Sequence, residues 1–443
     1  MASPNRVHIQ SGNTSIPWIR LFITVDILKN TDYKWPNSGT AMAFHHGLTI
    51  YLSVTRWPRV LEMLDDNPGL HNNTPVAYIV LMYAKGKKAT DPKDKVFALY
   101  SLFRELSIEL PKPDYEKSLE QIYREATVAS IKYDKLLNIL YYCPSDNRRL
   151  GLRSWVPDWS DPAWESDDSR SAMSHSRFAA CGPSDPRWHF ADDDTKLIVM
   201  GKIFDTVMYR SETMPDKAEI YRETRNGTDL LTPSRRLTEY GNKFLDFTRQ
   251  CLKTFKAWLE VSQWSNYSNG ESAQDAFRRT IIQDSHTPEI QYFDQWLNIL
   301  QASDSRIMEL ALDNTTPEWR QEVQPLLHET FLSRMMERVA ANVRTHFALG
   351  ETSNFCYYAM EMTCGKCFFR TENGYFGTAP DPASVCVEAG DKVAVVSGLA
   401  HPLLLRPVEG GGYRLLTHIY LHGIMYGEAW PDNDSVLEEL ALV

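Results

Sequence analysis

Apolar side chains recur at helical spacing through the first third of the chain. Residues 16–30 repeat apolar positions every three or four residues, which is typical of an amphipathic helix. Within residues 90–94 an aspartate precedes a proline, an order that indicates a helix start because aspartate caps free backbone N–H groups and proline fits the first turn. Ser118 and Gln121 form a capping box before another apolar repeat. The pattern predicts a helical region over residues 1–142.

The middle of the chain changes character twice. Residues 143–211 are rich in Pro, Ser, Asp and Trp, and they end in an apolar run over 197–209 that reads as an extended strand with Gly201 as a bulge. We therefore expect a loop and strand linker over this segment. Helical spacing returns in residues 212–350.

The last segment, residues 351–443, alternates short apolar runs with turn residues. Asn373-Gly374 separates two such runs, which predicts a hairpin with a type I′ turn. The glycines at 410–412 separate two more runs and predict a second hairpin. The predicted fold class is therefore α+β: a mainly helical body with a tryptophan-rich loop and a C-terminal small antiparallel β barrel or sandwich module.

The amino-acid composition argues against several classes of protein, among them nucleic-acid-binding and membrane-spanning proteins. The 443 residues include Lys+Arg 47 and Asp+Glu 57, so the net charge is −10, and 43% of residues are hydrophobic. A folded protein is expected, and an acidic chain without a basic block is a poor nucleic-acid binder. The start lacks an apolar signal region, and no stretch approaches the ~20 apolar residues of a membrane span. Seven cysteines are few and odd in number. These features predict a cytoplasmic protein with reduced thiols.

The sequence contains none of the common motifs for binding a nucleotide cofactor or activating a serine nucleophile. No glycine-rich phosphate loop or serine nucleophile elbow is present. Cys364 and Cys367 have the spacing of half a zinc site, but the other cysteines are single, so ordinary reduced thiols are expected. We therefore expect no cofactor and no metal.

Polar side chains with acid–base chemistry gather in the C-terminal segment. In a strand, His418, Tyr420 and His422 share one face because side chains alternate with period two. Together with Arg370 they are the candidate catalytic residues, since imidazole, phenol and guanidinium groups donate and accept protons or hydrogen bonds. The competing interpretation is a solvent-facing polar stripe of an antiparallel sheet.

Aromatic residues are abundant, with Trp 12, Tyr 21 and Phe 18. Trp155, Trp159 and Trp164 concentrate in one loop, and with Tyr375 they are the candidate residues for binding an apolar substrate. Most aromatic residues belong to protein cores, so the alternative is that this loop staples the helical layer to the β module.

Several motifs together resemble fungal heterokaryon-incompatibility (HET) family proteins. They occur in the family's order at residues 89–102, 113–118, 154–160, 365–377, 390–396, 404–407 and 420–428. In that family a TIR-like HET domain precedes this region and acts as the effector, with NAD cleavage or cell-death signalling implied. The chain resembles the region after that domain, with the HET domain itself absent, so none of its residues is expected to inherit the effector's catalytic role.

The resemblance leaves two functions open. The first is a scaffold that binds an apolar small-molecule ligand or a protein partner, without nucleic acid and without a membrane span. The second is an enzyme: the same body recruited as a cofactor-independent cyclase or isomerase, such as a Diels–Alder-type pericyclase of fungal secondary metabolism. Such reactions need conformational restriction and hydrogen-bond donors beside a carbonyl group.

Overall fold

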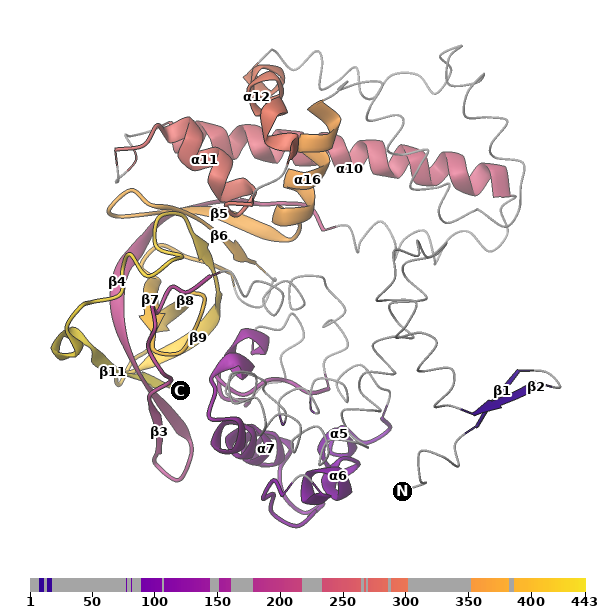
Figure 1. Ribbon diagram of the computed structural model, residues 1–443, viewed down its shortest axis with the longest axis vertical. Coiled ribbons are helices and arrows are strands. Elements are labelled where there is room, and N and C mark those ends of the chain that lie inside the picture. Colours follow the sequence, from indigo (N-terminus) through magenta and orange to yellow (C-terminus); the bar gives the residue numbers. More distant parts are fainter. Residues whose placement is uncertain are drawn as a thin grey trace. The chain divides into compact units, whose positions relative to one another are not determined.

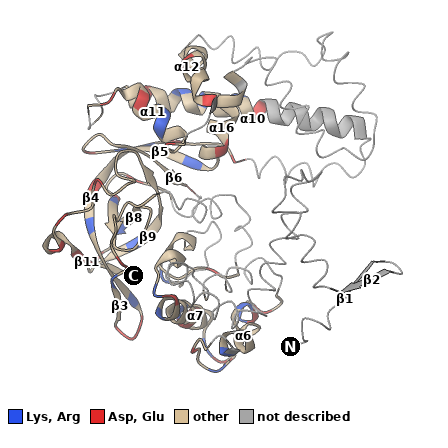
Figure 2. Ribbon diagram, in the orientation of Figure 1, with Lys and Arg blue, Asp and Glu red and all other residues tan. Residues whose placement is uncertain are grey.

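The chain forms two compact units, Met1–Leu136 and Leu137–Val443 (Figure 1). The structure is a computed structural model that describes these residues: 8–11, 14–17, 77, 81, 89–105, 107–143, 151–160, 178–216, 233–263, 267, 270–285, 288–301, 352–381 and 386–443. Acidic and basic residues lie interspersed over the described helices and strands (Figure 2).

The first unit contains a hairpin and three described helices. Strand β1 (His8–Ser11) pairs antiparallel with β2 (Thr14–Pro17). The predicted helix over residues 16–30 is thus wrong at its first two residues, whose backbone groups pair with β1; residues 18–30 lie outside the described part. The helices are α5 (Asp94–Phe97), α6 (Tyr100–Glu105) and α7 (Leu119–Asp134).

The predicted cap at Ser118 is confirmed, whereas the predicted cap at Asp91 is wrong, because the N-cap of α5 is Lys93 and has no side-chain capping hydrogen bond. The Asp91 carboxylate accepts the backbone N–H of Lys93 at 2.9 Å, although α5 begins only at Asp94. Ser118 accepts the N–H of Gln121 at 3.1 Å and caps α7. Two of the HET-like motifs also meet here, because the Tyr115 hydroxyl donates to Asp94 Oδ1 at 2.6 Å. These motif residues therefore stabilise local structure.

The second unit is built on a nine-stranded sheet that closes on itself. Its strands are β3 (Trp188–Ala191), β4 (Lys196–Thr213), β5 (Lys366–Thr371), β6 (Phe376–Pro380), β7 (Lys392–Val396), β8 (Leu403–Pro407), β9 (Tyr413–His418), β10 (Tyr420–Leu421) and β11 (Glu438–Leu442). Pairing runs β4–β11–β9–β8–β7 and returns from β7 to β4, which makes a closed five-stranded barrel. The α+β fold class with a C-terminal barrel is confirmed.

Strand β4 organises this unit. It pairs with β3, β11 and β7 along its first half and with β5 along its second half, so β5, β6 and β10 extend the barrel sheet. The sequence places β3 and β4 in a linker, whereas their hydrogen bonds make them part of the barrel sheet. Gly201 is not a bulge, since the register shifts lie beyond Ile203. A Cβ at Gly201 would lie 2.6 Å from the Val395 carbonyl, so the close approach of β7 requires glycine.

The predicted hairpin at Asn373-Gly374 forms, but its turn differs. The connection between β5 and β6 has four residues, and Thr371 N–H donates to the Tyr375 carbonyl at 3.0 Å. Gly374 has φ +87°, whereas Asn373 is not among the positive-φ residues. A type I′ turn needs positive φ at both central residues, so this longer loop is of another type.

Helices cover the β5–β6 extension. They are α10 (Pro233–Ser262), α11 (Ala273–Ile281), α12 (Phe293–Gln301) and α16 (Thr352–Thr363), with a 3-10 turn, η4 (Pro288–Tyr292), before α12 (Figure 1). Trp258 of α10 stacks on Phe368 of β5 at 5.6 Å between ring centroids, and its indole N–H donates to the Glu212 carbonyl at 2.8 Å. We call these helices the helical layer. No described helix combines the length and apolar character that a membrane span needs.

Candidate functional site

The residues His418, Tyr420 and His422 lie on the outer face of the barrel sheet. Ile419 and Leu421 belong to the barrel core, and because side chains alternate along a strand, their neighbours point the other way. Tyr420 and His422 are only 3% and 4% exposed. The interpretation as a solvent-facing stripe is therefore wrong, because other elements cover this face.

His422 is the centre of a polar cluster. Its Nε2 lies 2.8 Å from Glu271 Oε2, and its Nδ1 lies 3.5 Å from the Tyr420 hydroxyl. The Tyr267 hydroxyl donates to the His422 carbonyl, and the two rings face each other at 5.2 Å with a 30° tilt. Both Tyr267 and Glu271 come from the connection between α10 and α11. The cluster therefore joins the helical layer to the end of β10.

The partners of the His422 ring nitrogens limit the hydrogen bonds that the ring can make. A carboxylate only accepts hydrogen bonds, so a proton on His422 Nε2 points at Glu271, whereas the direction of the 3.5 Å contact between Nδ1 and the Tyr420 hydroxyl follows the tautomer of the ring. The other oxygen of Glu271 lies 3.2 Å from Arg279 Nε, which balances the carboxylate charge. Burial raises the pKa of the Tyr267 phenol far above its ordinary value, so this hydroxyl remains a donor at neutral pH.

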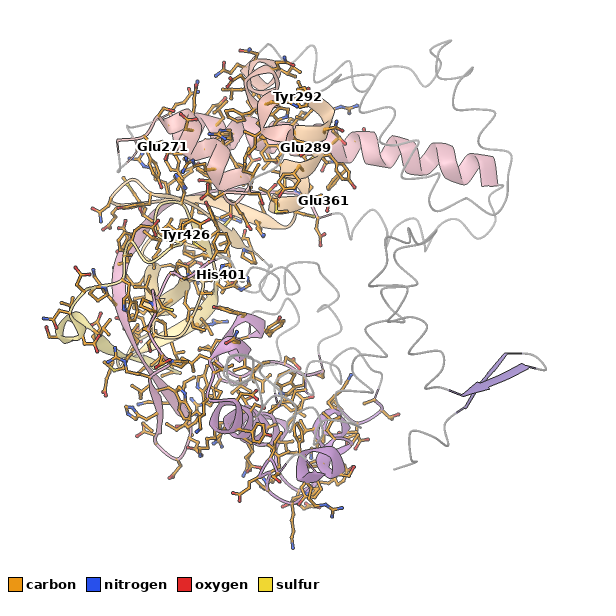
Figure 3. The ribbon with its side chains drawn as sticks, viewed as in Figure 1. Glu271, Glu289, Tyr292, Glu361, His401 and Tyr426 are labelled. Carbon is orange, nitrogen blue, oxygen red and sulfur yellow. The ribbon has the colours of Figure 1, made fainter. Side chains whose placement is uncertain are left out.

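A second group of rings continues the same face. Tyr141, His401 and His418 contact one another edge-on, with centroids 5.3 to 5.6 Å apart. Phe178 lies 5.2 Å from His401 and 5.7 Å from Tyr420, so it connects the two groups. Burial also raises the pKa of the Tyr141 phenol. Figure 3 labels His401 on the barrel and Glu271 in the helical layer.

Tyr375 lies beside the His422 cluster, and Arg370 lies further away. The Tyr375 ring is 6.0 Å from that of Tyr267. Arg370 is on β5, opposite Phe376, and β6 separates it from Tyr420 on β10. Among the described residues, its buried Nε has no hydrogen-bond acceptor.

The tryptophan loop is part of the barrel's packing. Trp155 and Trp159 are both 0% exposed, and Trp155 lies 5.7 Å from the Phe190 ring on β3. The Ser154 hydroxyl accepts the N–H of Leu415 at 3.0 Å. These contacts are with β3 and β9, and they do not involve the His422 cluster. Trp164 lies outside the described residues.

The cysteine pair has no metal geometry in the described part of the chain. Cys367 is fully buried in β5, and burial raises its pKa well above the ordinary thiol value. The Cys364 sulfur lies 3.6 Å from the Pro215 carbonyl. No three His, Cys, Asp or Glu side chains of the described residues gather as metal ligands.

Sequence reasoning missed Glu271 and Tyr267. Neither belongs to a motif, and both lie in a polar connection, Ser265 to Ser272, whose pattern only predicts a loop. Their roles depend on where that connection lies on the sheet. The sequence carries no local signal for that position.

The fold and the polar cluster define an α+β protein with a closed barrel, a sheet extension and a helical layer fastened to it. Residues 320–435 match the Het-6 β-barrel domain. The chain is 26% identical over 365 residues to heterokaryon incompatibility protein 6, OR allele, of Neurospora crassa. The chain is thus a relative of the heterokaryon-incompatibility proteins, as its motifs predict. No solved structure matches it.

Both matches cover only part of the proteins compared. The match with the Neurospora protein covers 76% of this chain and 49% of that protein, so the chain spans about half of its relative's length. The barrel-domain match ends at residue 435 and begins at 320. Strands β4 and β11, two of the five barrel strands, lie outside it, so the closed barrel draws on a longer part of the chain.

Proposed function

We propose that this chain is a HET-related scaffold that binds a protein partner. The proposal rests on the burial of the candidate catalytic and substrate-binding residues. His422, Tyr420 and Trp155 are buried and contact other parts of the same fold. In contrast, apolar side chains are displayed on the surface of β4. An apolar surface on a rigid barrel suits partner binding better than turnover.

The proposed contact surface is the pair Met208 and Tyr209. Their exposed fractions are 58% and 38%, and they lie where β4 leaves the barrel and pairs with β5. A register shift between Val207 and Tyr209 interrupts the alternation of side chains here, so two consecutive residues are both exposed. Methionine and tyrosine are enriched at protein interfaces, because methionine adapts to irregular surfaces and tyrosine combines an apolar ring with a polar tip. We propose a protein of the heterokaryon-incompatibility system as the partner, on the strength of the similarity to the Neurospora protein.

Replacing Met208 by Lys and Tyr209 by Ser in one variant should abolish partner capture. The tagged chain is incubated with a fungal extract, and native mass spectrometry measures the bound protein. We expect a stoichiometric partner on the wild type and at least about a tenfold loss on the double variant, since central interface residues dominate binding. Val436→Lys is the matched control, because Val436 is similarly exposed, at 53%, but lies in the 3-10 helix η6 (Asp434–Val436) and not in β4.

The proposal fails if no stoichiometric protein is captured, or if the double variant and the control behave alike. Circular dichroism melting of both variants ensures that lost binding does not reflect lost folding.

The Tyr420–His422–Glu271 arrangement supports a second candidate, the cofactor-independent cyclase or isomerase. A carboxylate that orients a histidine beside a phenol is an acid–base arrangement found in enzymes. The test is incubation with metabolites of a fungal extract and a search for products of unchanged mass. Loss of such a product in His422→Ala, with folding retained, supports an enzyme. Undiminished product formation in His422→Ala and Tyr420→Phe removes this candidate.

A further inference from the structure

The guanidinium group of Arg370 has no carboxylate partner among the described residues. Arg370 is the one partly exposed residue of β5, and its buried Nε has no hydrogen-bond acceptor in the part of the chain that the structure describes. In contrast, the guanidinium group of Arg406 on β8 lies 2.8 Å from the carboxylate of Asp391. Charged groups that are partly removed from water are normally paired, so the surroundings of Arg370 are incomplete.

A β-bulge places this guanidinium group beside the contact surface proposed above. Val207 pairs with Thr371 and Tyr209 pairs with Arg370, so β4 advances by two residues where β5 advances by one. Two residues of β4, Met208 and Tyr209, therefore oppose the single residue Arg370. Tyr209 and Arg370 are a direct pair and share a face of the sheet. We call Met208, Tyr209 and Arg370 the bulge patch.

The neighbours of the bulge patch leave the charge of Arg370 in place. Arg210, the next residue along β4, forms an ion pair with Asp381, whose carboxylate also accepts the hydroxyl of Thr213. Phe376, opposite Arg370 on β6, is fully buried and has no acceptor in its side chain. The patch thus combines two exposed apolar side chains with one positive charge that no described carboxylate neutralises.

We propose that the bulge patch binds an acidic side chain, Asp or Glu, of the protein partner. This inference rests on the proposed partner binding and names the chemistry of the partner's contact. A guanidinium group binds a carboxylate through two parallel N–H···O bonds, which makes the contact specific. Met208 and Tyr209 keep water from the ion pair, and this strengthens it because the local dielectric constant falls.

The first experiment needs no partner. Arg370→Met keeps an unbranched stem and removes the charge, so an unpaired guanidinium group predicts a urea midpoint equal to or higher than that of the wild type. Arg406→Met is the matched control and should lower the midpoint, because the guanidinium group of Arg406 is bonded to Asp391. A lower midpoint for Arg370→Met would mean that Arg370 already has a partner within the chain, and that outcome overturns the proposal.

The second experiment identifies the partner's carboxylate. The full chain carrying Arg370→Lys is incubated with the fungal extract and treated with a water-soluble carbodiimide. This reagent activates a carboxylate, the adjacent amine forms an amide bond with it, and the reagent leaves as a urea that has taken up the oxygen. Mass spectrometry of the linked peptides should place one end at position 370 and the other at an Asp or Glu of the captured protein. Arg370→Gln, which has no amine, should give no link at this position.

Partner capture by a charge-reversed variant separates this inference from the proposed function. Arg370→Glu should weaken capture at least about tenfold, and changing the linked acidic residue of the partner to Lys should restore it. If Arg370→Glu captures the partner as well as the wild type does, or if no link forms at position 370, this inference fails while partner binding stands. If the wild type captures no protein, the proposed function fails and this inference fails with it.

Discussion

Trp155→Ala should destabilise the barrel unit by about 3–5 kcal/mol, the range measured for buried tryptophan and phenylalanine truncations. Trp155 is 0% exposed and packs against Phe190, and its neighbour Ser154 bonds to Leu415 of β9. Removing the indole leaves a cavity between the loop and the strands. Urea denaturation followed by circular dichroism measures the change.

A graded control separates cavity formation from other effects. Trp155→Phe keeps part of the ring volume and should lose clearly less stability than Trp155→Ala. Trp159, also 0% exposed, should behave like Trp155. An unchanged urea midpoint for Trp155→Ala and Trp159→Ala would show that the loop is not part of the barrel's core.

Asp391→Ala should cost about 1.5–3 kcal/mol, the range for hydrogen bonds to charged groups, because Arg406 loses both of its bonds to Asp391 and keeps only the Glu388 carboxylate at 3.3 Å and the Cys386 carbonyl. Asp391 is 2% exposed, and its two oxygens lie 2.8 and 2.9 Å from Nε and Nη2 of Arg406. It also accepts the Glu388 N–H at 2.8 Å, which fixes the approach to β7. The hydrogen bonds that Arg406 donates to Asp391 are the main reason that the pKa of Arg406 is raised above its ordinary value.

The matched control is an ion pair of similar length on the surface. Arg187 Nη1 lies 2.9 Å from Asp434 Oδ2, but the side chains are 39% and 71% exposed. Water screens this pair, so Asp434→Ala should change the free energy of unfolding by less than about 1 kcal/mol. Equal effects of Asp391→Ala and Asp434→Ala in thermal and urea denaturation would contradict a special role for the buried pair.

The sequence by itself determined features that depend on near neighbours. The cap at Ser118, the hairpin around Gly374 and the extended run that became β4 all follow from local backbone chemistry. Alternation from His418, at the end of β9, through β10 also predicted that His418, Tyr420 and His422 share one face, because side-chain direction in a strand needs no tertiary information. The motifs likewise predicted the similarity to heterokaryon incompatibility protein 6 and to the Het-6 β-barrel domain.

Only the tertiary structure decided which partners these residues meet. Glu271 reaches His422 across 151 residues of sequence, and Asp391 meets Arg406 only because β7 and β8 pair. Strand β4 joined the barrel because its hydrogen bonds with β7 and β11 close the sheet. The polar stripe is a covered cluster because Tyr267 and Glu271, from the connection between α10 and α11, and Phe178 pack on it. Local pattern fixes the direction of a side chain, and long-range packing fixes its surroundings.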